Sequence, residues 1–256
     1  EDFIPAYTGF SDSGEIASGV IPSESEVMTV GNITDQPVTL YLSGKIYDTF
    51  DGRRWEQKYT GDDEDRLLDT IETVSNIKMK TGTEYNDYIK PVMFRVTYRY
   101  FSSSYLFAPL KTFRFSDCNK ELKIYRDGGN ILSKSKLSYG DSYIVNNMVM
   151  NSSNSSFSEL FKMKGTDEDD SVCVNTALQL SDGRYGNDIE TELSEHEAKI
   201  KEIYLHDIHL SDESRKYIAS VTSGAETDYD KLKCIEKALS KMKYDTAPGA
   251  LPAKVR

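Results

Sequence analysis

The sequence predicts a mainly β chain: an antiparallel, immunoglobulin-like β-sandwich followed by about three α-helices. The first observation is the aromatic content, since 17 tyrosines and 10 phenylalanines among 256 residues favour strands over a helical bundle. The second is that short alternating apolar segments, separated by turn residues, run to about residue 150 without a strand–helix–strand rhythm. The third is a change after about residue 190, where apolar residues recur at helical spacing.

The first predicted hairpin contains the only tryptophan of the chain. An alternating apolar strand over residues 38–47 passes a predicted bulge at Gly44 and enters an Asp51-Gly52 turn. Residues 54–59 then form the return strand.

The clearest strand covers residues 92–100, where large apolar residues alternate with arginine and threonine. This alternation predicts one buried and one solvated face. Other strands are predicted at residues 27–30, 106–115, 122–125 and 142–150, with a hairpin turn at Asp127-Gly128-Gly129-Asn130.

One helix is predicted inside the sandwich, directly after the acidic cluster at residues 62–65, because four acids suit a helix N-terminus. Its apolar stripe consists of Leu67, Leu68, Ile71, Val74 and Ile77.

These elements divide the chain into three parts. Residues 1–165 form the sandwich with its inserted helix, residues 166–190 an acidic loop or linker, and residues 191–256 a helical segment. In the last part Ser194 and Glu197 predict a capping box. Two further helices are predicted to begin after Ser211 and Thr227.

Composition excludes several classes of partner. A net charge of −11 would repel nucleic acid and anionic lipid over most of the surface, so neither is expected. No run of about 18 apolar residues is present to span a bilayer, and residues 1–12 lack the pattern of a signal peptide. The chain is therefore expected to be a soluble piece of a larger protein, associated with a membrane only through segments outside this sequence.

The reactive residues do not form a recognisable catalytic pattern. His196, His206 and His209 are the only histidines and could contribute to a zinc site, or could form a surface cluster. Cys234 lies beside an apolar helical stripe with no base and orienting group nearby in the sequence, and we reject it as a nucleophile. We therefore assign no catalytic, cofactor or metal residue.

The three cysteines, Cys118, Cys173 and Cys234, are too few and too scattered for a disulfide framework. One disulfide with a leftover thiol and three free thiols both remain open. The acidic runs at 62–65 and 167–170 lack the alternating ligands and the glycine of a calcium loop.

One candidate ligand or interdomain surface consists of Trp55 with Arg53 and Arg54. An aromatic face beside planar guanidinium groups suits stacking against a sugar, which would make the sandwich a binding module for cell-envelope glycan or protein. The alternative is that the tryptophan fills the sandwich core.

Four segments resemble the extracytoplasmic region of bacterial membrane-anchored proteins with a transglutaminase-like domain. YLSGKIYDTFDGRRW (residues 41–55) is similar to a strand pair that lies upstream of the catalytic core of that family. SSSYLFAPLKTFRF (102–115) resembles a loop of the same sheet, and residues 9–30 resemble the lead-in to its first strand. Residues 211–252 resemble the paired helices that open the transglutaminase-like domain.

This resemblance implies a parent protein that performs acyl transfer or peptide cleavage, with a Cys nucleophile, a His base and an orienting Asp. The elements that carry those three residues would lie beyond Arg256, so no catalytic residue can be assigned to this chain. It implies a non-catalytic scaffold whose partner is the downstream core of the same polypeptide. Lys233 and Cys234 depart from the family's helix pattern, and residues 165–186 have no counterpart.

Overall fold

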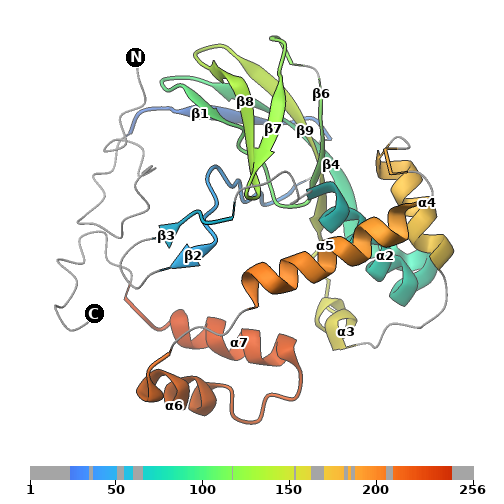
Figure 1. The fold of residues 1–256 in the computed structure, drawn as a ribbon, viewed down its shortest axis with the longest axis vertical. Coiled ribbons are helices and arrows are strands. Elements are labelled where there is room, and N and C mark those ends of the chain that lie inside the picture. The colour runs from blue at the N-terminus through green and yellow to red at the C-terminus, as the bar shows by residue number, and fades with distance from the viewer. Residues whose placement is uncertain are drawn as a thin grey trace.

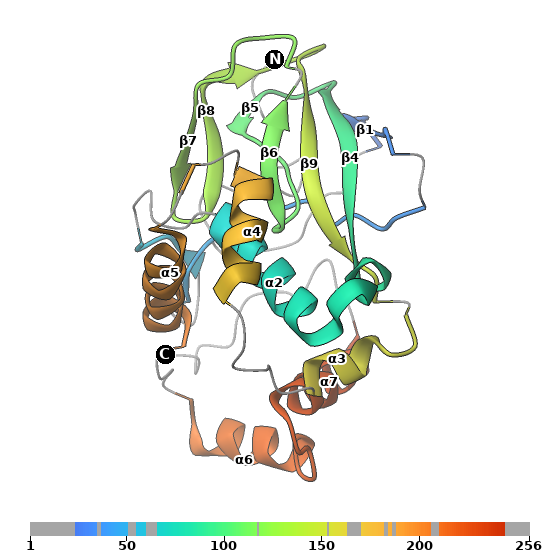
Figure 2. The same ribbon diagram turned by 90° about the vertical axis from the view of Figure 1, so that its right-hand side faces the viewer.

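The strands gather at one end of the molecule and most helices at the other (Figures 1 and 2). The computed structural model describes residues 24–34, 37–50, 55–59, 66–116, 118–152, 154–162, 170–181, 184–185, 188–205 and 210–243.

The larger sheet has the strand order β1-β4-β9-β6, and every pairing in it is antiparallel. Its central strands pair along most of their length, from Ile89 opposite Met150 to Thr97 opposite Ser142. The strands are β1 (Met28–Asn32), β4 (Ile89–Tyr98), β6 (Thr112–Ser116) and β9 (Ser142–Met150). The alternation predicted for residues 92–100 is confirmed as far as Tyr98, because Val92, Phe94, Val96 and Tyr98 are all buried, whereas Tyr100 lies beyond the end of β4 and is exposed.

A smaller antiparallel sheet, with the order β5-β8-β7, completes the core. It consists of β5 (Ser103–Tyr105), β7 (Ile124–Asp127) and β8 (Asn130–Leu137). Ile131 and Leu137 of β8 share one buried cluster with the inward residues of β4 and β9. The two antiparallel sheets therefore enclose a common core, whereas the immunoglobulin-like class remains a prediction.

Two predicted strands differ from the structure. Residues 38–47 form no strand, and their bridge-type pairing in the described part is an isolated bridge between Ser43 and Ala108. Of the predicted strand 106–115 only the second half is a strand, as part of β6; residues 106–111 form a loop after β5, and this loop contains Pro109, which has no N–H for a ladder. The predicted hairpin is present as β2 (Thr49–Phe50) paired with β3 (Trp55–Glu56), and its turn lies outside the described residues.

Helix α2 (Arg66–Thr81) is the inserted helix predicted from the sequence, and its expected apolar stripe is buried. A 3-10 helix, η1 (Gly82–Asp87), connects it to β4. The stripe belongs to a second buried cluster, which also contains Ile89 of β4. Further contributors come from α3 (Phe157–Lys162), α4 (Asp170–Ser181) and α5 (Ile189–Tyr204).

The interpretation of residues 166–190 as an acidic loop was wrong in its central part, where α4 lies. Thr176, Ala177 and Leu180 are buried on α4, and Ala177 and Leu180 join the cluster around α2. These three positions share one helical face, but the adjacent acids at 167–170 obscure that pattern in the sequence. The chain is therefore a mixture of antiparallel sheets and helices, with more helix than a mainly β class implies.

The last two described helices, α6 (Asp212–Val221) and α7 (Asp228–Leu239), form a hairpin at the end of the molecule away from the sheets (Figures 1 and 2). Both predicted start signals are confirmed, since Ser211 caps α6 and Thr227 forms a capping box with Asp230. The capping box predicted at Ser194 is wrong, because that residue lies inside α5. Within the described residues, no helix is long and apolar enough to cross a bilayer.

Candidate functional site

Arg66, the first residue of α2, holds three loops together. Its side chain is buried, with 7% of the residue exposed. One terminal nitrogen donates to the carbonyl oxygens of Ala108 and Pro109, each at 3.2 Å. The other donates to Ser43 Oγ at 2.9 Å and to the Gly129 carbonyl at 3.0 Å. Since a guanidinium offers five donors in a fixed plane, one residue can fix all three segments.

Two of these segments carry the sequence motifs singled out above. Ser43 and Ala108 exchange backbone hydrogen bonds, with N···O distances of 3.0 and 3.2 Å. Beside them the Phe107 ring lies directly against Gly44, where a Cβ atom would be 2.3 Å from Phe107 Cε1. The glycine is therefore needed for a close aromatic contact rather than for a bulge in a ladder.

The third segment is the predicted β7–β8 turn. Gly128 and Gly129 have positive φ angles of 52° and 73°, as a type I′ turn requires. The buried Asn130 side chain accepts a hydrogen bond from Ile46 N at 2.6 Å and donates to Ile46 O at 3.1 Å. It therefore pairs with Ile46 as another strand would, and fixes residues 45–47 beside the turn.

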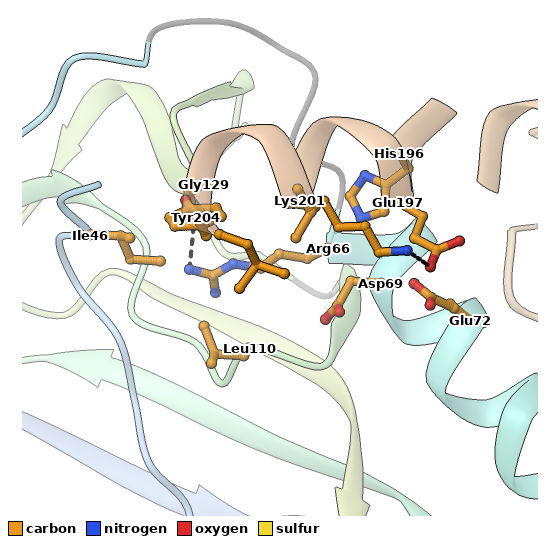
Figure 3. Close-up of a pocket in the computed structure, with 12 residues that line it drawn as sticks. Ile46, Arg66, Asp69, Glu72, Leu110, Gly129, His196, Glu197, Lys201 and Tyr204 are labelled. Carbon is orange, nitrogen blue, oxygen red and sulfur yellow. Dashed lines mark hydrogen bonds and ion pairs between the residues drawn. The ribbon is translucent and has the colours of Figure 1, made fainter. Parts of the chain in front are cut away.

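A cavity of about 490 Å³ lies between these loops and helices α2 and α5 (Figure 3). The loops contribute Ile46, Leu110 and Gly129, and α2 contributes the polar residues Arg66, Asp69 and Glu72. The opposite wall is formed by His196, Glu197, Ile200, Lys201, Tyr204 and Leu205, from α5 and the residue after it.

Carboxylates dominate the end of the cavity between α2 and α5. Two of them are ion-paired: Asp69 with Lys111 at 2.6 Å, and Glu197 with Lys201 at 2.5 Å. Glu72 lies near both acids and forms no ion pair or hydrogen bond with the described residues. Burial raises the pKa of the Glu72 carboxyl, and the charges of Glu197 and Asp69 raise it further. Lys111 and His196 act in the opposite direction.

His196 is the most buried residue of α5 after Ile189, with 5% of its surface exposed. Its ring forms part of the cavity wall at the acidic end, as Figure 3 shows. The buried Nδ1 atom has no hydrogen-bond partner. A buried imidazole nitrogen without a partner is costly to stability.

The other end of the cavity is apolar. Figure 3 shows Ile46, Leu110 and Tyr204 there, with the Arg66 guanidinium directed to Gly129 and away from the acids. The cavity therefore has one end lined by charged side chains and one end lined by apolar side chains. It can accept an elongated small molecule with one polar and one apolar end.

Of the surface predicted from the sequence, only Trp55 lies in the described residues, and Arg53 and Arg54 are outside them. Trp55 is on β3, is 44% exposed, and packs beside Phe50 with ring centroids 5.1 Å apart. It is not part of the two buried clusters.

The remaining candidates are dispersed. His196 is buried rather than on the surface, and His206 and His209 lie outside the described residues. Cys118 and Cys234 are half-buried and form no disulfide in the described part, and the Cys173 side chain is outside it. Within the described ranges, no group of three or more His, Cys, Asp or Glu residues is arranged to hold a metal ion.

Sequence reasoning missed the residues that form the cavity. Arg66 directly follows four acidic residues. Because that acidic cluster was interpreted as a helix N-terminus, Arg66 was not recognised as a candidate site residue. Glu197 and Lys201 form an i,i+4 pair on α5, with His196 beside them, which could have marked one wall.

No protein-family model matches the chain, and no curated protein matches it. Among solved structures, two crystal structures of the periplasmic domain of TgpA from Pseudomonas aeruginosa match, one of them bound to ethylmercury. Their sequence identities to this chain are 13% and 12%, and both TM-scores are 0.44. The matches cover 89% of this chain and 60% and 61% of the matched chains, so it spans about three-fifths of their length.

Proposed function

We propose that this chain is a non-catalytic scaffold on the extracytoplasmic side of a bacterial membrane, as part of a membrane-anchored transglutaminase-like protein. In this proposal the α6–α7 hairpin is the first element of the transglutaminase-like core. Its apolar face packs against core elements that follow in the same polypeptide.

The observation that carries the proposal is the unburied apolar surface of the hairpin. Neither α6 nor α7 has a buried residue. Leu232 is 64% exposed, and Leu239 and Met242 are also more than half exposed. These residues recur at helical spacing on and just after α7, so they form a stripe suited to another helix.

The hairpin touches the body of the molecule over a small area. Tyr229 of α7 stacks on Phe161 of α3, with centroids 5.0 Å apart and planes 5° apart. Beside this stack Lys162 forms an ion pair with Asp230 at 3.8 Å. Such a limited contact leaves most of the apolar surface available to a partner.

The sequence resemblance supports the same proposal. The segment similar to the family's paired helices contains both hairpin helices, α6 and α7. The two resembling segments of the sandwich, residues 41–55 and 102–115, meet at the Ser43–Ala108 bridge. Their contact supplies a physical reason for the two motifs to occur together.

The first test of the proposal is an activity assay on the purified chain. Cys234 is half-buried and has no hydrogen bond to a base in the described part, so we expect neither amide hydrolysis nor amine incorporation. Turnover that persists after alkylation of Cys234 would contradict the proposal, since it would need no downstream core.

The parent gene provides the second test. We expect its reading frame to continue for about 100 residues or more, the size of a domain. The extension should contain a Cys near the start of a helix, then a His, then an Asp, and the gene should encode membrane-spanning segments. A frame without these three residues in that order would exclude the transglutaminase-like assignment.

The exposed Trp55–Phe50 pair favours a second candidate function, a binding module for cell-envelope glycan or protein. If envelope glycan fragments bind here, they should quench or shift the fluorescence of Trp55, the only tryptophan. Phe50→Ala should then weaken binding, whereas Tyr139→Ala, which changes an exposed aromatic in the β8–β9 turn, should not.

A further inference from the structure

Lys78, in the last turn of α2, has neutral groups around its ammonium. The ammonium donates to Thr176 Oγ1 at 3.5 Å and to Gln179 Oε1 at 3.4 Å, both on α4. It also lies 4.8 Å from the centre of the Tyr85 ring on η1, whose phenol is the titratable group among these neighbours. Both hydrogen bonds are long, so the three contacts position the ammonium without neutralising its charge.

Among the described residues, no carboxylate lies within ion-pair distance of Lys78, although the chain carries a net charge of −11. By contrast, Lys111, Lys120 and Lys201 are each ion-paired with an acid. Burial lowers the pKa of the Lys78 ammonium, since the hydration that it loses is not replaced by a negative charge. The carbonyl end of α2 favours the charged form and acts in the opposite direction.

The neighbours of Lys78 can accommodate an uncharged amine as well as an ammonium. A hydroxyl group both donates and accepts, and an amide side chain carries both kinds of group, so Thr176 and Gln179 can donate to a nitrogen lone pair. An ionised carboxylate in either place would only accept, and would hold the nitrogen in its charged form. The hydrogen bond to Gln179 lies at the surface, so a small molecule can approach the nitrogen from that side.

We propose that Lys78 is an acylation site, at which its ε-amine takes the acyl group of a small activated donor, an acyl phosphate. The ammonium first loses a proton to water. The amine nitrogen then attacks the acyl carbon, and a C–N bond forms while the C–O bond to phosphate breaks. The departing phosphate takes the second proton from the nitrogen and leaves as inorganic phosphate.

The product fits the same surroundings. Acylation replaces a half-buried positive charge, which has no counter-charge in the described part, by a neutral amide. The remaining N–H can still donate to Gln179 Oε1, and the new carbonyl oxygen can accept from a hydroxyl or an amide. This inference concerns α2, α4 and η1 and does not depend on the scaffold proposal.

The test is acetylation of the full chain with limiting acetyl phosphate, followed by peptide mass spectrometry to give a rate for each lysine. Lys90, exposed on β4, is the internal comparison. We expect Lys78 to be acetylated severalfold faster than Lys90 near neutral pH, because a lower pKa leaves more of it as free amine. Its rate should also reach a plateau at a lower pH. A rate at Lys78 equal to or below that at Lys90 would overturn the proposal.

A second measurement tests the neutral surroundings. Gln179→Glu replaces one hydrogen-bond partner of Lys78 by a carboxylate of nearly the same shape, and should slow acetylation of Lys78 severalfold. Ser135→Asp adds the same charge at an exposed position of β8 and should leave that rate unaltered. Thermal denaturation confirms that both variants fold, and the comparison of Lys78 with Lys90 needs no variant. An unchanged rate in Gln179→Glu would show that these neighbours do not set the reactivity, and would also overturn the proposal.

Discussion

Gly44 lies in a position that leaves no room for a side chain. Alanine here would place its Cβ 2.3 Å from Phe107 Cε1, and that ring also packs against Tyr98 and Phe101. We expect Gly44→Ala to lower the free energy of unfolding by about 1–3 kcal/mol, the usual cost of overpacking, as measured by urea denaturation.

Gly31→Ala is the matched control for this substitution, because nothing lies within 4 Å of its added Cβ. It should change stability by less than about 0.5 kcal/mol. Combining Gly44→Ala with Phe107→Leu should cost less than the sum of the two single changes, since the smaller side chain relieves the collision. If the two changes in the free energy of unfolding were strictly additive, they would contradict the contact between residue 44 and Phe107.

Arg66 stabilises the junction of three loops through buried hydrogen bonds. Arg66→Met keeps most of the aliphatic stem but leaves the carbonyl groups of Ala108, Pro109 and Gly129 without this donor. We expect a loss of about 2–4 kcal/mol in the free energy of unfolding. Arg114→Met, at an exposed residue of β6, should have little effect, and equal losses would refute the bridging role.

Glu72 should make stability depend on pH in a predictable direction. Burial and the neighbouring acids raise its pKa above 4.5, so the folded state retains the proton to a higher pH than the unfolded state. The folded state then binds more protons between the two pKa values, and stability falls as pH rises through this window.

Glu72→Gln removes this titration. We therefore expect the variant to be more stable than the wild type at pH 7.5, and the difference to shrink as the pH is lowered below 4.5. Urea denaturation at both pH values measures it. The direction of the effect is set by burial and by the charged groups around the carboxyl, which are Glu197, Asp69, His196 and Lys111. A larger stability difference at low pH than at pH 7.5 would contradict this cause.

At the scale of elements, the hairpin α6–α7 should open independently of the sheets. It has no buried residue, and its contact with α3 depends on the stack of Tyr229 on Phe161. Tyr229→Ala should therefore speed amide hydrogen exchange across residues 212–239 while leaving β4 and β9 protected.

Tyr217→Ala, which changes an exposed aromatic of α6, is the comparison for this experiment. It should leave exchange in α7 close to that of the wild type. If Tyr229→Ala exposes the sheets to exchange as well, the hairpin and the body unfold as one unit, and the element boundary proposed here is incorrect.

The elements predicted well from sequence are those with long, uniform periodicity. In α2 every expected inward residue is buried, and in β4 every one as far as Tyr98, because one face of each packs against a buried cluster; Tyr100, also expected inward, lies beyond the end of β4 and is exposed. Residues 38–47 alternate equally clearly, yet they form no strand, since a turn-like hydrogen-bond network through Asn130 and Arg66 replaces a ladder. Apolar periodicity indicates which side chains are buried, but it does not indicate which segment supplies the hydrogen-bond partners of the backbone.

The cavity could not have been predicted from sequence in the same way. Its walls combine residues near positions 46, 66, 110, 129 and 200, which come together only through the hydrogen bonds of Arg66 and Asn130 and the packing of α5 against α2. The charge at Glu72 stands out only after Lys111 and Lys201 are found paired with other acids. Ion-pair assignments of this kind depend on tertiary distances and leave no local signature.

At the scale of the whole molecule, the two ends differ in how completely their apolar surface is covered. The sheets enclose a core of fully buried residues, whereas the hairpin has none. If the hairpin opens a transglutaminase-like core, as we propose, its stripe should be covered only in the longer parent protein. Covering such a stripe removes apolar surface from water, which stabilises the joined domains.

Hydroxyl-radical footprinting of the chain and of its parent tests this directly. In the isolated chain Leu232, Leu239 and Met242 are exposed and should be oxidised readily. In the parent they should be protected severalfold, while Tyr139, exposed in the turn between β8 and β9, should react equally in both. Leu232→Ser with Leu239→Ser should lower the stability of the parent but not of the isolated chain, because the stripe has no partner there. Equal oxidation of the stripe in both proteins would mean that the hairpin does not form the junction, and the scaffold proposal would lose its main support.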